Sequence, residues 1–305
     1  MTTGLNPTAE IFLSNLQQIE NRISAAEQQL SSGLRVNRAS DAPDQISGIL
    51  QLRAQIAGVQ QTQENLAAVT PQVETAGSVI QQAIQVLDTA TQLATEAAGG
   101  TSSATQRQDA VPQVEGILQQ LVSLSQTAVN GQYIFSGDQS GQPSYAMNAT
   151  GDGVVQLITP GPPGQIADAN GLPISIGLTA QQIFDDRDAG GNPAADNVFG
   201  AVSGLLAALQ ANDSAGIQNA LSNIQAASAH LNDESSFYGA AQNNMTNASN
   251  AAATTLTQLQ QQLSSEQDAD AAQASLDLQS ALTNEQAAMA AQAQFKPQSL
   301  FSYLS

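Results

Sequence analysis

The sequence TAEIFLSNLQQIENRISAAEQQL (residues 8–30) repeats apolar side chains at alternating steps of four and three residues. The repeat consists of Phe12, Leu16, Ile19, Ile23, Ala26 and Leu30. This heptad spacing places them on one side of a helix, and Gln, Asn, Ser and a few charges occupy the other sides. A helix of about 25 residues is about 38 Å long and too thin to bury such a stripe alone. The stretch therefore predicts a long helix that needs a partner helix.

The C-terminal part of the chain offers that partner. Apolar residues recur there every seven positions with leucines between them, at Leu231, Tyr238, Met245, Ala252 and Leu259, with Leu256 and Leu263. After a shift of register, the stripe continues through Leu278, Leu282 and Met289. Both ends of the chain thus have a coiled-coil pattern, whereas the middle does not. We predict a mainly α protein, with a long antiparallel helical bundle or coiled coil formed by the N- and C-terminal segments and a small β-containing domain inserted in the middle.

The composition excludes several kinds of partner. Charged residues make up only 11% of the 305 residues, and the formal net charge is −19. The first 53 residues are nearly neutral, at −1, because they hold Arg22, Arg35, Arg38 and Arg53, whereas the rest of the chain has a net charge of −18. A chain without a basic patch is a poor partner for nucleic acid or an anionic membrane. We interpret the acidity as a solubility feature.

The sequence also excludes thiol chemistry and a membrane span. The chain has no cysteine, so disulfides, thiolate metal sites and a cysteine nucleophile are excluded. The N-terminal sequence MTTGLNPTAEIF lacks the basic and apolar regions of a cleavable secretion signal. No run of about 18 apolar residues is present. We expect no cofactor, no metal and no enzymatic activity.

Helix signals divide the N-terminal half. Thr8 is a candidate N-cap for the first helix, and Gly33 a candidate stop. We expect Asp41 to cap a second helix with Pro43 in its first turn. Apolar positions from Ile49 to Ala94 continue that helix, and Pro71 should kink or break it.

Further signals mark a third helix, the middle of the chain and the C-terminal half. The third helix is expected around Val111–Leu121, with Pro112 near its start, where proline is tolerated. Strands are expected at residues 133–135, 154–159 and 174–178, where β-branched residues lie between Gly, Pro and Asn. Helix resumes at Val198, and Asp213 or Ser214 caps another that continues to about residue 292, with an interruption near 234–237.

These signals suggest three domains. Residues 1–45 and 260–305 would form a terminal coiled-coil assembly domain, and 46–136 with 197–259 a helical bundle domain. Residues 137–196 would form a small β-rich outer domain. Because inserted segments with close ends cost little closure entropy, we expect residues 138–195 to be replaceable by a short linker, unless they hold the neighbouring helices together.

The stretch QQLSSGLRVNRASDAPDQISG (residues 28–48) resembles the motif that joins the first two helices of the bacterial flagellin family. The motif residues are Leu30, Ser31, Ser32, Gly33, Arg35, Asn37 and Asp41. NGQYIFSG (130–137) and the C-terminal QSLFSYLS are also similar to that family. Within it, the short Gly/Pro-rich insert and the C-terminal ending are more similar to the hook-associated protein 3 class, which forms the junction between hook and filament. The resemblance covers nearly the whole chain except about 138–195.

The resemblance implies a structural subunit of the bacterial flagellum, exported without a cleavable signal peptide through a type III apparatus. It implies assembly with copies of itself and with other flagellar axial proteins, namely hook-associated proteins and flagellin, and an export chaperone. The assembly surfaces would be the N-terminal seam of Phe12, Leu16, Ile19, Ile23 and Leu30, and a C-terminal seam and tail of Leu278, Leu282, Met289, Leu300, Phe301, Tyr303 and Leu304. The alternatives are a filament flagellin of the same fold or a secreted coiled-coil effector or adhesin.

Three groups of charged residues allow further interpretations. The early arginines could pair with Glu266, Asp268, Asp270, Asp277 and Glu285, within or between subunits. The spacing of Asp186, Asp188 and Gly191 fits the first half of a calcium-binding loop, but the bidentate Glu is missing, so an acidic surface loop is favoured. His230, the only histidine, has no catalytic partners in the sequence, and we interpret it as a helix-surface residue.

Overall fold

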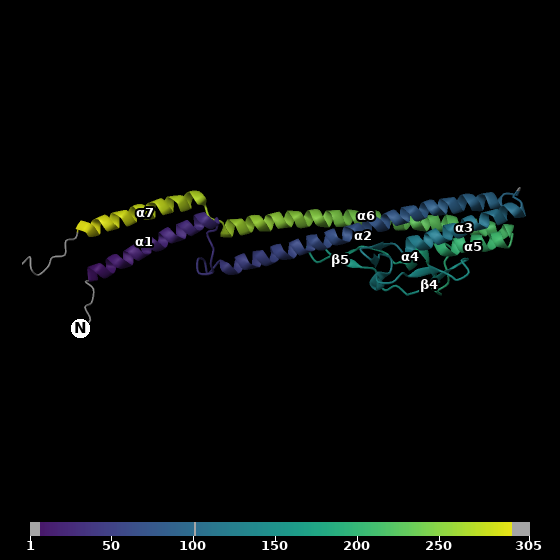
Figure 1. Ribbon diagram of the computed structural model, residues 1–305, viewed down its shortest axis with the longest axis horizontal. Coiled ribbons are helices and arrows are strands. Elements are labelled where there is room, and N and C mark those ends of the chain that lie inside the picture. Colours follow the sequence, from purple (N-terminus) through teal and green to yellow (C-terminus); the bar gives the residue numbers. More distant parts are fainter. Residues whose placement is uncertain (1–6, 101, 295–305) are drawn as a thin grey trace, which may run out of the picture. The chain divides into compact units, whose positions relative to one another are not determined.

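A computed structural model describes residues 7–100 and 102–294 of the chain (Figure 1). The chain forms two compact units, which are described separately below. The terminal unit contains residues 1–57 and 255–305, and the central unit contains residues 58–254. The division falls inside two long helices, α2 (Ile46–Ala98) and α6 (Ser214–Gln267). The three-domain organisation proposed from the sequence stays a prediction.

In the terminal unit, the two ends of the chain pair as helices. α1 (Pro7–Ser32) and α7 (Ala271–Gln294) lie side by side and run in opposite directions (Figure 1). The prediction that Thr8 caps α1 is wrong, because the helix already begins at Pro7. Proline suits the first helical position since its missing N–H has no partner there in any case. The predicted stop at Gly33 is confirmed: its φ is +72°, and its amide donates to the carbonyl oxygen of Gln29.

In the central unit, α2 and α6 form the predicted antiparallel helix pair. Gln81 Nε2 donates to Ser235 Oγ at 2.5 Å. The two helices also approach closely at Gly77, where an added Cβ atom would lie 3.3 Å from Gln242 Nε2. Apolar residues seven positions apart are buried in this part of both helices, namely Val73, Ile80, Leu87 and Ala94 on α2 and the predicted Leu231, Tyr238, Met245 and Ala252 on α6. The mainly helical, antiparallel fold predicted from the sequence is therefore confirmed.

Two prolines lie inside helices, in contrast to the prediction. α2 continues through Pro71 without a break, and Pro112 lies well inside α3 (Ala104–Ser125) rather than near its start. α3 begins earlier than predicted because Ser103 and Gln106 form a capping box. Pro71 leaves the carbonyl group of Ala67 without its intrahelical donor. Ala67 and Pro71 are exposed, so water can donate a hydrogen bond to the carbonyl group of Ala67.

The predicted interruption of the C-terminal helix near residues 234–237 is also wrong. α6 runs without a break to Gln267, and α7 starts after Asp268–Asp270. Asp270 caps α7, because its Oδ1 accepts from the amides of Ala272 and Gln273. At the other end of α6, Asp213 acts as predicted, since its Oδ1 accepts from the amide of Ala215.

The middle of the chain contains three separate two-stranded antiparallel hairpins. They pair β1 (Ala128–Val129) with β2 (Gln132–Tyr133), β3 (Tyr145–Met147) with β4 (Val154–Gln156), and β5 (Gln165–Ala167) with β6 (Pro173–Ser175). The 3₁₀ turn η1 (Gly137–Gln139) and two helices complete this part, α4 (Ala180–Phe184) and α5 (Val198–Gln210). The strands are shorter than predicted, and the sequence analysis missed β1, β3, β5 and α4.

This middle segment contributes to the core of the central unit. Tyr145, Ile183 and Phe184 are buried in the same apolar cluster as α2, α3, α5 and α6. The ring of Phe184 lies 6.0 Å from Phe135 and 5.5 Å from Phe199 between ring centroids. This packing favours the second outcome left open for residues 138–195, that they hold the neighbouring helices together, because their removal would open the aromatic centre of this core. The effect of replacing them by a linker stays a prediction.

Replacing Phe184 with alanine should destabilise the central unit by about 3–5 kcal/mol, the usual cost of removing a buried aromatic ring. Urea denaturation followed by circular dichroism measures this change. Leu172→Ala is the matched control, because Leu172 is 63% exposed in the same segment. A Phe184→Ala variant as stable as the control would show that the middle segment is energetically separate from the helices.

Candidate assembly site

The N-terminal seam faces α7 as the heptad predicts. Phe12, Leu16, Ile19 and Ile23 are partly buried, and Ala26 is buried, although among the described residues α7 is the one helix that packs along α1. Leu30, at the end of α1, is exposed. The seam thus exists within one chain, and most of its large side chains keep some accessible surface.

On α7, the residues that face α1 are mostly alanines. Ala274 and Ala281 are buried and Leu278 is partly buried, as are Glu285 and Ala288 further along. These positions keep the steps of four and three residues that define a heptad seam. Small side chains on one helix let it approach the large side chains of the other.

The other two predicted α7 seam residues, Leu282 and Met289, do not face α1. They are 40% and 52% exposed. Each follows a seam alanine by one residue, and one residue turns a helix by about 100°. The sequence analysis followed the largest apolar side chains and therefore chose the wrong side of the helix. Their role in subunit assembly stays a prediction, and the tail residues Leu300, Phe301, Tyr303 and Leu304 lie outside the described residues.

Most of the exposed large apolar side chains belong to the terminal unit. Within the described part of the chain, seven of the ten belong to it: Ile11, Leu13, Leu30, Leu50, Leu276, Leu282 and Met289. The other three, Val155, Leu157 and Leu172, lie on the hairpins of the central unit. Contiguous apolar patches mark sites of protein interaction, so these side chains are candidates for such a site.

A loop of residues 33–45, here called the connecting loop, joins α1 to α2 and binds the break between α6 and α7. Leu34 and Asp268 form an antiparallel β-bridge. The amides of Arg35 and Val36 donate to the carbonyl oxygen of Gln267 at 2.7 and 3.2 Å, and the amide of Ala269 donates to the carbonyl of Gly33. Two interruptions that are more than 200 residues apart in the sequence are thus tied together by backbone hydrogen bonds.

Polar side chains of the connecting loop hold its shape. Asn37 Nδ2 donates to Ser32 Oγ at 2.7 Å, and Ser32 Oγ also accepts from the amide of Leu34. Asp41 Oδ2 accepts from the amides of Asn37 and Arg38 at 3.0 and 2.7 Å. The family motif therefore supplies the residues that close this loop, with Ser31 bonded only to the preceding turn of α1.

The prediction that Asp41 caps the second helix is wrong. Its carboxylate bonds backward to the loop amides, and α2 begins five residues later, at Ile46. The amide of Arg38, followed by that of Asn37, lowers the pKa of Asp41, because both amides stabilise the ionised carboxylate. Val36 and Ala42 on the loop are buried with Ile49, against the partly buried Leu263.

Arg35 fixes the loop through hydrogen bonds rather than ion pairs. Its Nη2 donates to Gln45 Oε1 at 3.0 Å and to the carbonyl oxygen of Glu266 at 2.6 Å. In residues 7–100 and 102–294, none of the four early arginines forms an ion pair. The expected pairs within one chain are therefore absent from this part of the structure, and pairing between subunits stays a hypothesis.

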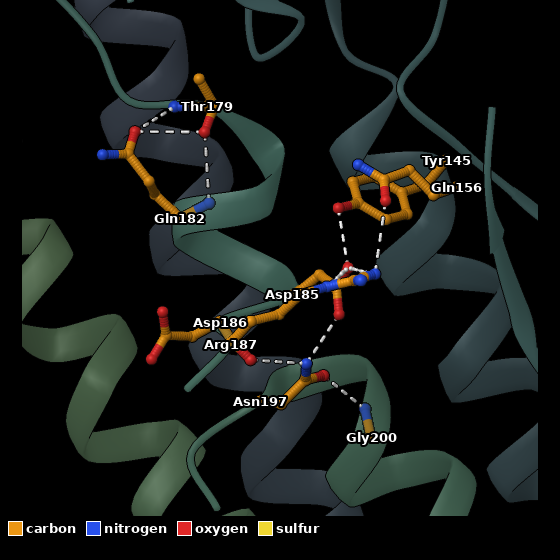
Figure 2. Close-up of polar contacts among 9 residues, drawn as sticks. All are labelled: Tyr145, Gln156, Thr179, Gln182, Asp185, Asp186, Arg187, Asn197 and Gly200. Atoms are coloured by element: carbon orange, nitrogen blue, oxygen red, sulfur yellow. Dashed lines mark hydrogen bonds and ion pairs between the residues drawn. The ribbon is translucent and has the colours of Figure 1, made fainter. Parts of the chain in front are cut away.

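The acidic stretch considered for calcium contains a carboxylate that is already occupied (Figure 2). Asp185 Oδ2 accepts from Tyr145 Oη at 2.8 Å and from two nitrogens of Arg187, and Asp185 Oδ1 accepts from Asn197 Nδ2 at 2.7 Å. Burial, followed by the charge of Asp185, raises the pKa of Tyr145 above its usual range. Asp185 thus joins β3, the end of α4 and the start of α5.

Asp188, in the acidic loop that follows, is bonded to amides of the same loop. Asp188 Oδ1 accepts from the amides of Gly190 and Asn192, as is common for aspartate in turns. Across the described ranges, no three acidic or histidine side chains gather in a way that could hold a metal ion. Likewise, no helix in those ranges is both long enough and apolar enough to cross a membrane.

The sequence analysis missed the partner of the connecting loop. Gln267 is buried, and it provides the carbonyl that accepts from both loop amides. The signal that could have located it is Asp268-Ala269-Asp270, since an aspartate three residues after Gln267 is a good N-cap for a new helix. The alanine seam of α7 gives a weaker signal, because alanines are frequent throughout that helix.

Comparison with known proteins gives matches at both ends of the chain. Residues 5–140 match the bacterial flagellin N-terminal helical region, and residues 221–304 match the bacterial flagellin C-terminal helical region. Flagellin B of Helicobacter pylori is 28% identical over 143 residues, which are 46% of this chain and 28% of that protein. The chain therefore matches only about a quarter to a third of the length of this relative.

Solved structures share the fold. A protein of Vibrio parahaemolyticus described as a flagellar hook-associated protein is 18% identical, with a TM-score of 0.64, covering 75% of this chain and 100% of that one. Flagellar hook-associated protein 3 of Legionella pneumophila is 15% identical, with a TM-score of 0.60, covering 71% and 98%. At these identities the likeness concerns the fold.

Replacing Asp41 with alanine should loosen the connecting loop and lower the hydrogen-exchange protection of the Asn37 and Arg38 amides, because both lose their acceptor. Hydrogen exchange measured by NMR tests this. Asp44→Ala, at another exposed acidic position of the loop, is the control and should leave both amides unchanged.

The same measurement has an expected pH dependence. A carboxylate with a lowered folded-state pKa stabilises the loop above its unfolded pKa, about 3.9 for aspartate, and the stabilisation is lost as the pH falls through the folded value. Protection of both amides should therefore persist at about pH 4 and disappear in stronger acid. Protection that the Asp41→Ala variant retains would contradict the role given to this carboxylate.

Proposed function

We propose that this chain, which belongs to the bacterial flagellin family, is a structural and non-enzymatic subunit of the flagellum that joins the hook to the filament. The family matches at both ends cover most of the chain, and the fold is that of flagellar hook-associated proteins. The role would be mechanical, with the terminal helices entering the axial core and the central unit lying outside it.

The observation that carries this proposal is the concentration of exposed apolar side chains in the terminal unit. Burying one Leu, Ile or Met side chain contributes about 1.5–3 kcal/mol. These seven side chains are 36–62% exposed, so each would contribute about half of that value on burial, and together they could supply a free energy of the same order as the cost of association, which is estimated at about 4–15 kcal/mol. Contacts between unlike surfaces of identical subunits build a ring when the rotation closes and a helical assembly when it does not.

The partners would be further copies of this chain together with other flagellar axial proteins, namely hook-associated proteins and flagellin. The apolar face of α7 around Leu282 and Met289 would bury against a neighbouring subunit, and the C-terminal tail would extend the same surface. A dedicated chaperone would shield these side chains before export, since an apolar surface of this kind is an aggregation liability in a free monomer. The working location would be the extracellular flagellum.

A filament flagellin is the second candidate, because the relative compared by sequence is itself a flagellin. Two features favour the junction role: the short middle segment and the fold similarity to hook-associated proteins. Antibody labelling of isolated flagella separates the two. A single band at the distal end of the hook supports the junction role, whereas label along the whole filament supports flagellin.

Changing Leu282 and Met289 together to glutamine should prevent incorporation into flagella without unfolding the monomer. Both side chains are already exposed, so the free energy of unfolding should change by no more than about 0.5 kcal/mol per site. Immunoblots of isolated flagella measure incorporation, and swimming assays measure function.

The matched control is Leu157→Gln with Leu172→Gln, which removes two apolar side chains that are 53% and 63% exposed on the central unit. This control should incorporate as the unchanged protein does. Normal incorporation of the Leu282 and Met289 variant would mean that this face of α7 is not an assembly surface.

A further inference from the structure

A groove lies between α2 and α6 in the central unit. It has a volume of about 590 Å³ and lies along residues 66–74 of α2 and 242–250 of α6. The apolar residues Leu66, Val73 and Met245 line it and are no more than 4% exposed, so they form its floor. A groove with an apolar floor and polar residues around it suits a long side chain that is apolar along its stem and polar at its tip.

Two hydrogen-bond acceptors on the α2 side of the groove have no donor. Ala67 and Glu74 both line the groove, and Pro71 lies between them. Because Pro71 has no N–H group, it cannot donate to the carbonyl oxygen of Ala67. Glu74 is exposed, and its carboxylate forms no hydrogen bond or ion pair within residues 7–100 and 102–294. Residues 67, 71 and 74 are four and three positions apart, so they share one face of the helix.

The arginines of the central unit are already engaged elsewhere. Arg107 donates through its Nε to the carbonyl oxygen of Ala97 at 3.1 Å, and Arg187 forms an ion pair with a neighbouring aspartate at 2.6 Å. In the terminal unit, by contrast, Arg22 and Arg53 are exposed, and in the described part of the chain their side chains form no hydrogen bond or ion pair. The free guanidinium groups and the free acceptors therefore belong to different units.

We propose that this groove receives an arginine side chain, Arg22 or Arg53, from the terminal unit of a second copy of the chain. The methylene stem packs on the apolar floor, and the guanidinium group donates to the carbonyl oxygen of Ala67 and to the carboxylate of Glu74. A guanidinium group has five N–H donors in a fixed fork, so one arginine can serve both acceptors. The inference rests on the proposed assembly of several copies of this chain.

The distribution of charge favours a second copy as the occupant. The central unit, residues 58–254, holds two basic and 16 acidic residues, whereas four of the seven basic residues of the chain lie within residues 1–53. Arginine-bearing and acidic surfaces of identical molecules are complementary to each other. A contact between two unlike surfaces of one chain can repeat from copy to copy, as a ring or a helical assembly requires.

Cross-linking of isolated flagella tests which chains meet at the groove. The chain has no cysteine, so introduced cysteines are its only thiols. The test variants combine Glu74→Cys with Arg53→Cys or with Arg22→Cys. The matched controls combine Glu64→Cys with the same partners, because Glu64 is exposed on α2 but does not line the groove. A short bismaleimide should give dimers and larger multiples of the chain with at least one Glu74 pair, and not with the matching Glu64 pair.

Exchange of the two charges tests the ion pair itself. Glu74→Arg should lower the amount of protein incorporated into flagella about threefold, the size expected for a partly exposed ion pair, and Arg53→Glu or Arg22→Glu should do the same. A chain that carries both changes should incorporate as the unchanged protein does, since the pair is then restored with its charges exchanged. Circular dichroism checks that each variant is folded, and immunoblots of isolated flagella measure incorporation.

The outcomes separate this inference from the proposed function. If the unchanged protein is absent from isolated flagella, the proposed function fails, and the inference fails with it. If the unchanged protein is present but the Glu74 pairs cross-link no better than the Glu64 pairs, the groove does not receive a second copy. Cross-links from Glu74→Cys to a different flagellar protein would overturn the inference as well. Cross-linking between copies without rescue by either charge exchange would overturn the assignment of an arginine.

Discussion

The terminal helices depend on one constraint: an isolated helix cannot bury an apolar stripe, so each end of the chain must find the other. α1 and α7 satisfy this constraint within one chain, and the connecting loop fixes where the two ends meet. The bond between Gln267 and the amides of Arg35 and Val36 is local in space but joins residues about 230 positions apart. Long-range contacts of this kind carry a loop-closure cost, which grows only slowly with chain length. The loop-closure entropy therefore does not prevent the two ends of a chain of this size from pairing.

In the central unit, the apolar stripes of the long helices are buried by additional elements. Its helix pair is covered over part of its length by α3 and α5, and the aromatic rings of Phe135, Phe184 and Phe199 fill the space beside them. The short hairpins have too few residues to be stable alone. The β3–β4 hairpin is anchored by the buried side chain of Tyr145, whose hydroxyl donates to Asp185. The polar network is thus a condition for placing an aromatic side chain in this core.

Periodicity predicted the long helices, their pairing and the buried heptad positions, because these depend on spacing that the sequence displays directly. It failed where the choice depends on competition between partners. Asp41 can cap a helix or close a loop, and the amides of Asn37 and Arg38 decide between them. On α7, alanines and larger residues compete for the seam, and only the position of α1 identifies Ala274 and Ala281. The break at residues 268–270 was missed because apolar and alanine positions continue on both sides of it.

The alanine seam of α7 has a consequence for how stability is distributed. α7 packs its smallest side chains against α1, whereas Leu282 and Met289 stay exposed. Folding of a single chain therefore buries little apolar surface on α7 and contributes little free energy there. Anything that binds the folded helix pair but not the unfolded ends then adds its binding free energy to the stability of that pair, by an amount that rises with its concentration. The melting temperature of the terminal helices would therefore not be a fixed property of the polypeptide. It would report the concentration of whatever binds the folded pair.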